Sequence, residues 1–176
     1  MERSSPPGVK SVPERSKVTF ITAAMEAAAG RKIARFVSHP ISVSDIRKWL
    51  IAVYWPEPPP PLQRDGDGRV LAPEEFNPFA WSVAAGDRSW HATGHDPETY
   101  LGIARPAVSA AVNGGIEVEY GARMRADDVI TAVSHLVGYS ERDGRKGRLL
   151  FRTVEELWTS QDAGLIKRVR LTLIPY

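Results

Sequence analysis

Three side chains that could move protons lie close together in the segment Trp90–Asp96. His91, His95 and Asp96 could form an acid–base dyad, or the two histidines could hold a metal ion. The segment also fits a polar loop in which Asp96 caps a short helix started by Pro97 while both histidines face solvent. We favour the loop, because short motifs without structural context seldom prove functional. We therefore expect no metal site, and the three residues are only weak catalytic candidates.

Aromatic side chains gather in the long stretch between Tyr54 and Tyr100, which has little periodicity. A structureless stretch of this length in a compact domain is usually functional or disordered, and its aromatic content argues against disorder. We therefore interpret it as an ordered segment that walls a cavity. Five of its side chains could line an apolar binding pocket, although ordinary core filling explains them equally well: Trp55, Phe76, Phe79, Trp81 and Tyr100.

The composition excludes several classes of protein. The chain has no cysteine, which excludes disulfides, thiolate zinc sites and cysteine catalysis. Its net charge is only +2 and its basic residues are dispersed, so nucleic acid is not an expected partner. No apolar run is as long as a membrane span, and Met1–Lys17 lacks the hydrophobic core of a signal peptide. We expect a cytoplasmic protein with no membrane partner.

The elements that must position these residues are clearest between Asn113 and Tyr176. Apolar and polar residues alternate there with a period of two, which is typical of half-buried antiparallel strands. Segments rich in Asp and Gly separate the strands and suit tight turns. We predict an antiparallel meander of four strands that begin near these residues: Asn113, Val129, Arg148 and Leu165.

A helix is expected upstream of the sheet, over Ser42–Tyr54. Its start, Ser42–Asp45, resembles a capping box with Asp in place of the usual Glu. Four apolar residues recur at helical spacing and should be buried against the sheet: Val43, Ile46, Leu50 and Val53. Helix and sheet together predict an α+β fold.

Four motifs in order resemble the amino-terminal, dehydratase-type domain of MaoC-like proteins: Ala72–Phe76, Asn113–Tyr120, Arg125–Asp128 and Glu141–Arg148. The members of that family are (R)-specific enoyl-thioester hydratases and 3-hydroxyacyl dehydratases. The resemblance covers Ala23–Tyr176. It implies a hot-dog fold, an antiparallel sheet wrapped on a helix. We expect a single domain over residues 19–176, preceded by a flexible leader over residues 1–18.

The resemblance implies reversible addition of water to an acyl-CoA or acyl-carrier thioester, with coenzyme A thioester as substrate and no further cofactor. The family's Asp and His, in an Asp-x-Asn-Pro-Leu-His segment after the first helix, move the proton of the water. Here Pro58 stands where that Asp belongs and Gln63 where that His belongs. Neither side chain exchanges protons usefully near neutral pH. This departure implies a substrate-binding half that pairs as a homodimer, or as a heterodimer with a catalytic hot-dog subunit.

Two further groups of residues are candidates for substrate binding only because of this resemblance. Asn113, Gly114 and Gly115 could let a thioester approach the backbone closely, or could simply end a preceding helix. Arg148, with Arg145 and Lys146, could meet the phosphates of coenzyme A; a solvated turn explains Arg145 and Lys146 better. Two other functions stay open: an acyl-thioester binding protein without chemistry, and a hot-dog thioesterase, which rests on analogy of fold.

Overall fold

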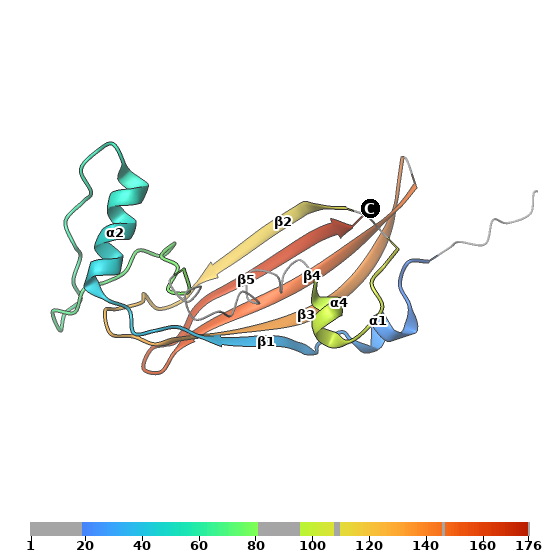
Figure 1. Cartoon of the computed structure of the whole chain (residues 1–176), viewed down its shortest axis with the longest axis horizontal. Helices are drawn as coiled ribbons and strands as arrows, with labels where there is room; N and C mark the ends of the chain where they lie inside the picture. The colour runs from blue at the N-terminus through green and yellow to red at the C-terminus, as the bar shows by residue number, and fades with distance from the viewer. Residues whose placement is uncertain (1–18, 81–95, 108–109, 146, 176) are drawn as a thin grey trace, which may run out of the picture.

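In the computed structural model of the chain, residues 19–80, 96–107, 110–145 and 147–175 are described. Their main feature is one antiparallel sheet of five strands in the order β1-β3-β4-β5-β2 (Figure 1). The strands are β1 (Lys32–Val37), β2 (Ala111–Tyr120), β3 (Ile130–Gly144), β4 (Gly147–Ser160) and β5 (Gly164–Pro175). With the helices below, the sheet confirms the predicted α+β class.

The strand order corrects the prediction of a four-stranded meander. β3, β4 and β5 do follow one another in space, but β2 lies beyond β5, with Ile116 opposite Leu171. Pairing even continues past β2, since the N–H of Gly121 donates to the carbonyl of Ile166 at 2.8 Å. Alternation in a sequence reports which face a side chain takes, not which strand is the neighbour, and this is why the prediction was wrong.

One face of the sheet is buried and follows the alternation along β3 and β4. The buried residues on β3 are Ile130, Ala132, Ser134 and Leu136. The register then shifts between Leu136 and Gly138, so that Tyr139 lies opposite Arg152, a buried residue of β4. This bulge moves Tyr139 to the buried face, away from the face of Val137, which is exposed.

The helices begin where the sequence supplies caps. α1 (Ala23–Ala27) follows Thr22, whose hydroxyl accepts the N–H of Met25. α2 (Val43–Tyr54) follows Ser42, whose hydroxyl accepts the N–H of Asp45 at 3.0 Å, as the capping-box pattern predicts. The helix α4 (Pro97–Leu101) is short and carries its proline in the first turn. No helix in the described ranges is long and apolar enough to cross a membrane.

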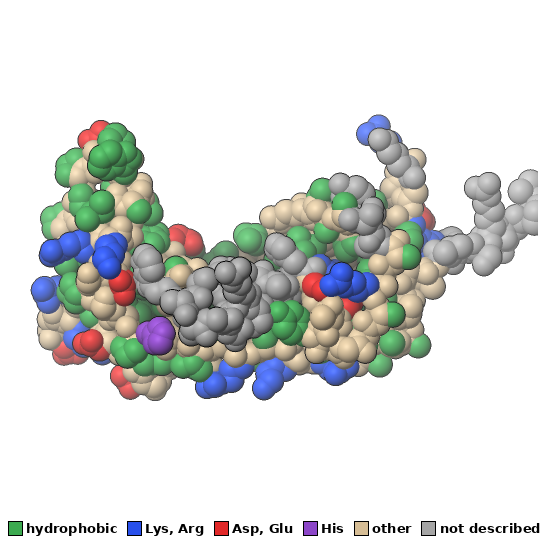
Figure 2. All heavy atoms as spheres, in the orientation of Figure 1, with side chains coloured by type: hydrophobic (Ala, Val, Ile, Leu, Met, Phe, Trp, Pro, Cys, Tyr) green, Lys and Arg blue, Asp and Glu red, His purple; other side chains and the backbone are tan. Residues whose placement is uncertain are grey.

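Helix α2 lies at one end of the sheet, and α1 and α4 lie toward the other (Figure 1). Of the four residues predicted to be buried on α2, Ile46 and Leu50 are buried, but Val43 and Val53 are 39% and 56% exposed. The prediction was wrong for these two because the helix meets only the end of the sheet and so buries a narrow stripe. Hydrophobic side chains remain visible on the projecting end that contains α2 (Figure 2).

The main core joins α2 to the sheet through the segment that follows the helix. Its larger members come from α2, from the loops after it and from three strands: Ile46, Leu50, Val70, Phe76, Phe79, Ile130, Trp158 and Ile166. A smaller cluster packs under α1 and α4, with Ala28, Leu101, Leu136 and Val154. The loop after α2 is therefore anchored to the sheet.

Candidate functional site

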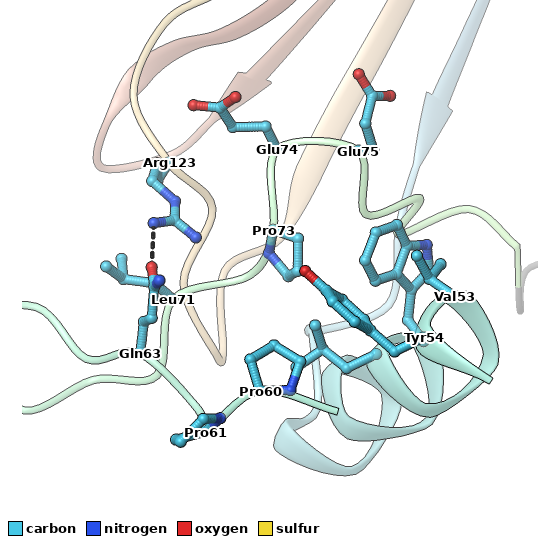
Figure 3. Close-up of a pocket in the computed structure, with 12 residues that line it drawn as sticks. Val53, Tyr54, Pro60, Pro61, Gln63, Leu71, Pro73, Glu74, Glu75 and Arg123 are labelled. Carbon is cyan, nitrogen blue, oxygen red and sulfur yellow. Dashed lines mark hydrogen bonds between the residues drawn. The ribbon is translucent and has the colours of Figure 1, made fainter. Parts of the chain in front are cut away.

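A pocket of about 300 Å³ opens between α2 and the chain that returns from it toward the sheet (Figure 3). Its walls are mostly apolar, as in ligand pockets generally. The lining residues come from the second half of α2, from the proline-rich segment, from the chain beyond it and, for Arg123, from the segment after β2: Trp49, Leu50, Val53, Tyr54, Pro60, Pro61, Gln63, Leu71, Pro73, Glu74, Glu75 and Arg123.

The segment that carries Gln63 and Leu71 is a tight hairpin. The N–H of Leu71 donates to the carbonyl of Gln63 at 2.9 Å, and the carboxylate of Asp65 accepts the N–H of Arg69 at 2.9 Å. The guanidinium of Arg69 in turn meets the buried carboxylate of Asp128 at 2.9 Å. A wall fixed by this many hydrogen bonds is preorganised for binding.

Arg123 joins the two sides of this hairpin. Its Nη1 donates to Oε1 of Gln63 at 2.7 Å (Figure 3). Its Nη2 donates to the carbonyl of Ala72 at 2.8 Å. Gln63 is the residue that stands where the resemblance places the catalytic histidine. The structure therefore puts an amide, which cannot take up or release a proton near neutral pH, in the wall of the pocket.

The pocket also carries two carboxylates, Glu74 and Glu75, both exposed. Oε2 of Glu75 lies 3.9 Å from Nζ of Lys167, a residue of β5 that is only 7% exposed. Nζ of Lys167 also sits 4.2 Å from the ring centroid of Trp158. Burial lowers the pKa of Lys167, although the charges of Glu75 and Glu156 act in the opposite direction. The Glu75–Lys167 pair ties the rim of the pocket to the sheet.

A second buried polar cluster lies under α4 and is separate from the pocket. Oε2 of Glu98 accepts from Nη1 of Arg152 at 2.8 Å, and its Oε1 accepts from the hydroxyl of Tyr139 at 2.8 Å. Glu98 is completely buried and Arg152 is 5% exposed. Burial and the neighbouring carboxylate of Glu98 raise the pKa of the Tyr139 hydroxyl. We interpret this cluster as the attachment of α4 to the sheet.

The described aromatic candidates do not form one wall. Phe76 and Phe79 are core residues, 1% exposed each, and the ring of Phe79 meets Trp158 edge to face at 5.1 Å. Trp55 ends α2 and is 78% exposed, and Tyr100 lies on α4. Of the aromatic residues on the pocket wall, Trp49 and Tyr54 were not among the predicted site residues. Each lies four residues from a pocket residue of α2, Trp49 from Val53 and Tyr54 from Leu50, and this spacing could have indicated that they share a face of the helix.

The segment Asn113–Gly115 lies on the edge strand β2, where the register shifts against β5. The side chain of Asn113 accepts the N–H of Gly115 at 2.9 Å, and a Cβ on Gly114 would come within 2.9 Å of Ile174. The segment begins β2, whereas the other end of the strand points toward the end of the molecule that holds α2 (Figure 1) and precedes Arg123 of the pocket in the sequence. The structure therefore does not bring these residues to the pocket.

Among the charged candidates, Asp96 caps α4, as predicted, by accepting from the N–H and the hydroxyl of Thr99, and it pairs with Arg105. Arg145 is exposed on a turn, and Arg148 pairs with Glu141 at 3.2 Å. Four candidates lie outside the described residues: Trp81, His91, His95 and Lys146. Within the described ranges, no group of three acidic or histidine side chains could hold a metal ion.

Fold and pocket together define a class: an α+β hot-dog domain with an apolar pocket beside its first long helix. A family model described as "FAS1-like, dehydratase domain region" matches residues 27–169. Because this match covers most of the chain, the protein belongs to the FAS1-like dehydratase domain family.

Comparison with solved structures agrees on the fold. The ChsH1–ChsH2 complex from Mycobacterium tuberculosis contains a chain 14% identical, with TM-score 0.52, over 88% of this chain and 89% of that one. The (R)-hydratase from A. caviae involved in PHA biosynthesis is 13% identical, with TM-score 0.50, over 82% of this chain and 94% of that one. At these identities the likeness is one of fold alone. A comparison with curated protein sequences gave no match.

Proposed function

We propose that this chain is the substrate-binding half of an enoyl-thioester hydratase or 3-hydroxyacyl dehydratase. The observation that carries the proposal is that position 63 holds a glutamine. In the resemblance this position belongs to the catalytic histidine, and here it holds an amide fixed by Arg123. Neither a histidine nor an aspartate lines the described pocket. The walls can hold an acyl group, and on this proposal the usual acid–base pair comes from another subunit.

The two carboxylates of the pocket are poor substitutes for that pair. Glu75 is engaged by Lys167, and Glu74 is exposed to solvent. In Figure 3 both side chains point away from Pro60 and Pro61. General acid–base catalysis requires a titratable group within hydrogen-bond reach of the reacting atom, and a matched acid as well as a base. We therefore assign these glutamates to the rim.

The partner would be a second hot-dog subunit that pairs along β2. All ten residues of this edge strand are exposed, among them the apolar Ile116, Val118 and Tyr120. A long exposed edge of this kind is a ready template for another strand. The solved ChsH1–ChsH2 structure is itself a complex, which supports pairing as a heterodimer.

The test compares the purified chain with the complex that it forms in its native host. We expect the chain alone to bind saturated acyl-CoA without hydrating trans-2-enoyl-CoA, and the complex to hydrate it. His91→Ala and His95→Ala should leave the rate of the complex within a fewfold, since loss of a true acid or base costs about 10²–10⁴-fold. Hydration by the chain alone, at a rate that the partner does not raise, would refute the proposal. Release of free thiol instead would indicate a thioesterase.

A further inference from the structure

The guanidinium of Arg123 has more donors than the protein uses. Its Nε and Nη2 both donate to the carbonyl of Ala72, at 3.3 and 2.8 Å, and its Nη1 donates to Gln63 at 2.7 Å. A guanidinium carries five N–H groups. Two of them therefore have no acceptor among the described residues, in a side chain that lines the pocket.

Arg123 is also the only cation among the residues that line the described pocket. The walls opposite are aromatic, aliphatic and proline side chains, so a guanidinium there is only partly hydrated. The negative charge of Glu75 is offset by Lys167, 3.9 Å away, and Glu74 is exposed, where solvent and salt screen it. An anionic group entering the pocket would therefore meet the positive charge of Arg123, while one of the two carboxylates of the pocket is offset by Lys167 and the other is screened by solvent.

We propose, building on the function above, that the pocket selects a short acyl thioester whose acyl group ends in a carboxylate. A carboxylate would accept charge-assisted hydrogen bonds from the unused N–H groups of Arg123. A methyl end of the same length would instead displace water from those groups and leave them unpaired. The volume of about 300 Å³, at the low end for ligand pockets, favours a short acyl group. Arg123 is thus the specificity-determining residue.

Butyryl-CoA and succinyl-CoA provide a matched pair of probes, because their acyl chains have the same length and differ in the terminal carboxylate. We expect calorimetric titration of the full chain to give a dissociation constant roughly tenfold or more lower for succinyl-CoA. Arg123→Gln should remove this preference, because it should weaken the binding of succinyl-CoA more than the binding of butyryl-CoA. Glu74→Gln should increase the preference by removing a negative charge from the rim. Arg35→Gln, at an exposed position of β1 away from the pocket, should change nothing.

Arg123→Lys covers the case in which the glutamine variant does not fold, since it keeps the charge and should keep part of the preference. Equal affinity for the two thioesters would overturn the inference and leave the proposed function standing. A preference that survives in folded Arg123→Gln would also overturn it, because the carboxylate would then bind elsewhere. Binding of neither thioester would overturn both the inference and a substrate-binding role for this chain.

Discussion

Glu98 and Arg152 form an ion pair that is almost completely removed from solvent. Each charge is therefore tolerated in the interior only because the other neutralises it. Breaking a buried pair by removing one partner strands the other charge and costs about 3–5 kcal/mol. Glu98→Ala should therefore lower the free energy of unfolding by that amount, measured by urea denaturation. Glu57→Ala, on an exposed loop, is the control and should be nearly silent.

The double variant Glu98→Ala with Arg152→Met sharpens this prediction. It removes both charges, so it should recover part of the stability that Glu98→Ala loses. If the double variant is less stable than the single one by a further full increment, the two residues act independently. The interpretation of the cluster as the attachment of α4 would then be wrong.

The carboxylate of Glu141, on β3, holds the backbone at the start of the described chain. Its carboxylate accepts the N–H groups of Phe20 and Ile21 and the hydroxyl of Thr19, and it pairs with Arg148. Burial acts to raise the pKa of Glu141, but these four partners together bring it below its ordinary value. Such a carboxylate stabilises the fold above its unfolded pKa, about 4.3, and the contribution disappears as pH falls through the lower folded pKa.

Glu141→Gln should consequently be less stable than the wild type near neutral pH, and the two should converge as the solution is acidified below about pH 4. The measurement is the free energy of unfolding of both proteins across this range. Glu57→Gln serves as the matched exposed control. A difference that stays constant with pH would show that the charge of Glu141 does not matter.

At the scale of elements, the contact between the end of β2 and β5 depends on a glycine. A Cβ on Gly121 would lie 2.2 Å from the carbonyl oxygen of Leu165, so the backbone itself would have to move. Gly121→Ala should destabilise the fold by about 1–3 kcal/mol. Gly66→Ala, where a Cβ meets nothing within 4 Å, should be neutral or slightly stabilising. Thermal unfolding of the two variants checks this, and equal effects would contradict it.

The elements were predictable where the signal is local. Ser42 marked the start of α2 because a capping hydroxyl acts within its own turn, and alternation marked the strands because it reports a buried face. The position of β2 beside β5 is set by contacts between residues far apart in sequence. The exposure of Val43 and Val53 depends likewise on where α2 meets the sheet.

The buried charged residues and the pocket were harder to predict from the sequence than the helices and strands. Arg152 stands in the same alternating row as Leu150 and Val154, and Lys167 in the row of Val169 and Leu173. A charged residue in an apolar row was a visible sign of a buried polar group. Arg123 had no such sign, because its role arises only when Gln63 and Ala72 fold back beside it.

At the scale of the molecule, the open edge of β2 predicts that the purified chain, in the absence of the catalytic partner, pairs with itself along this edge. Light scattering should give a mass above 19.4 kDa at micromolar concentration. Ile116→Lys, at a position 58% exposed on β2, should lower the mass toward that value if subunits pair along this edge.

Val137→Lys distinguishes edge pairing from back-to-back pairing. Val137 lies on β3, inside the sheet, and is 41% exposed. Edge pairing predicts that this variant keeps the mass of the wild type. Loss of the larger species with Val137→Lys but not with Ile116→Lys would place the interface on the back of the sheet. A single mass of 19.4 kDa for the wild type would refute self-association altogether.

The place of β2 in the sheet also orders events during synthesis of the protein. β1, β3 and β4 can pair as soon as each leaves the ribosome, but the only neighbour of β2 in the described sheet is β5, with Ala111 opposite Pro175. Until β5 emerges, the apolar side chains of β2 have no strand beside them and are open to other nascent chains. A shortened product that lacks β5 would lose two strands, not one, and should be a substrate for chaperones and proteases.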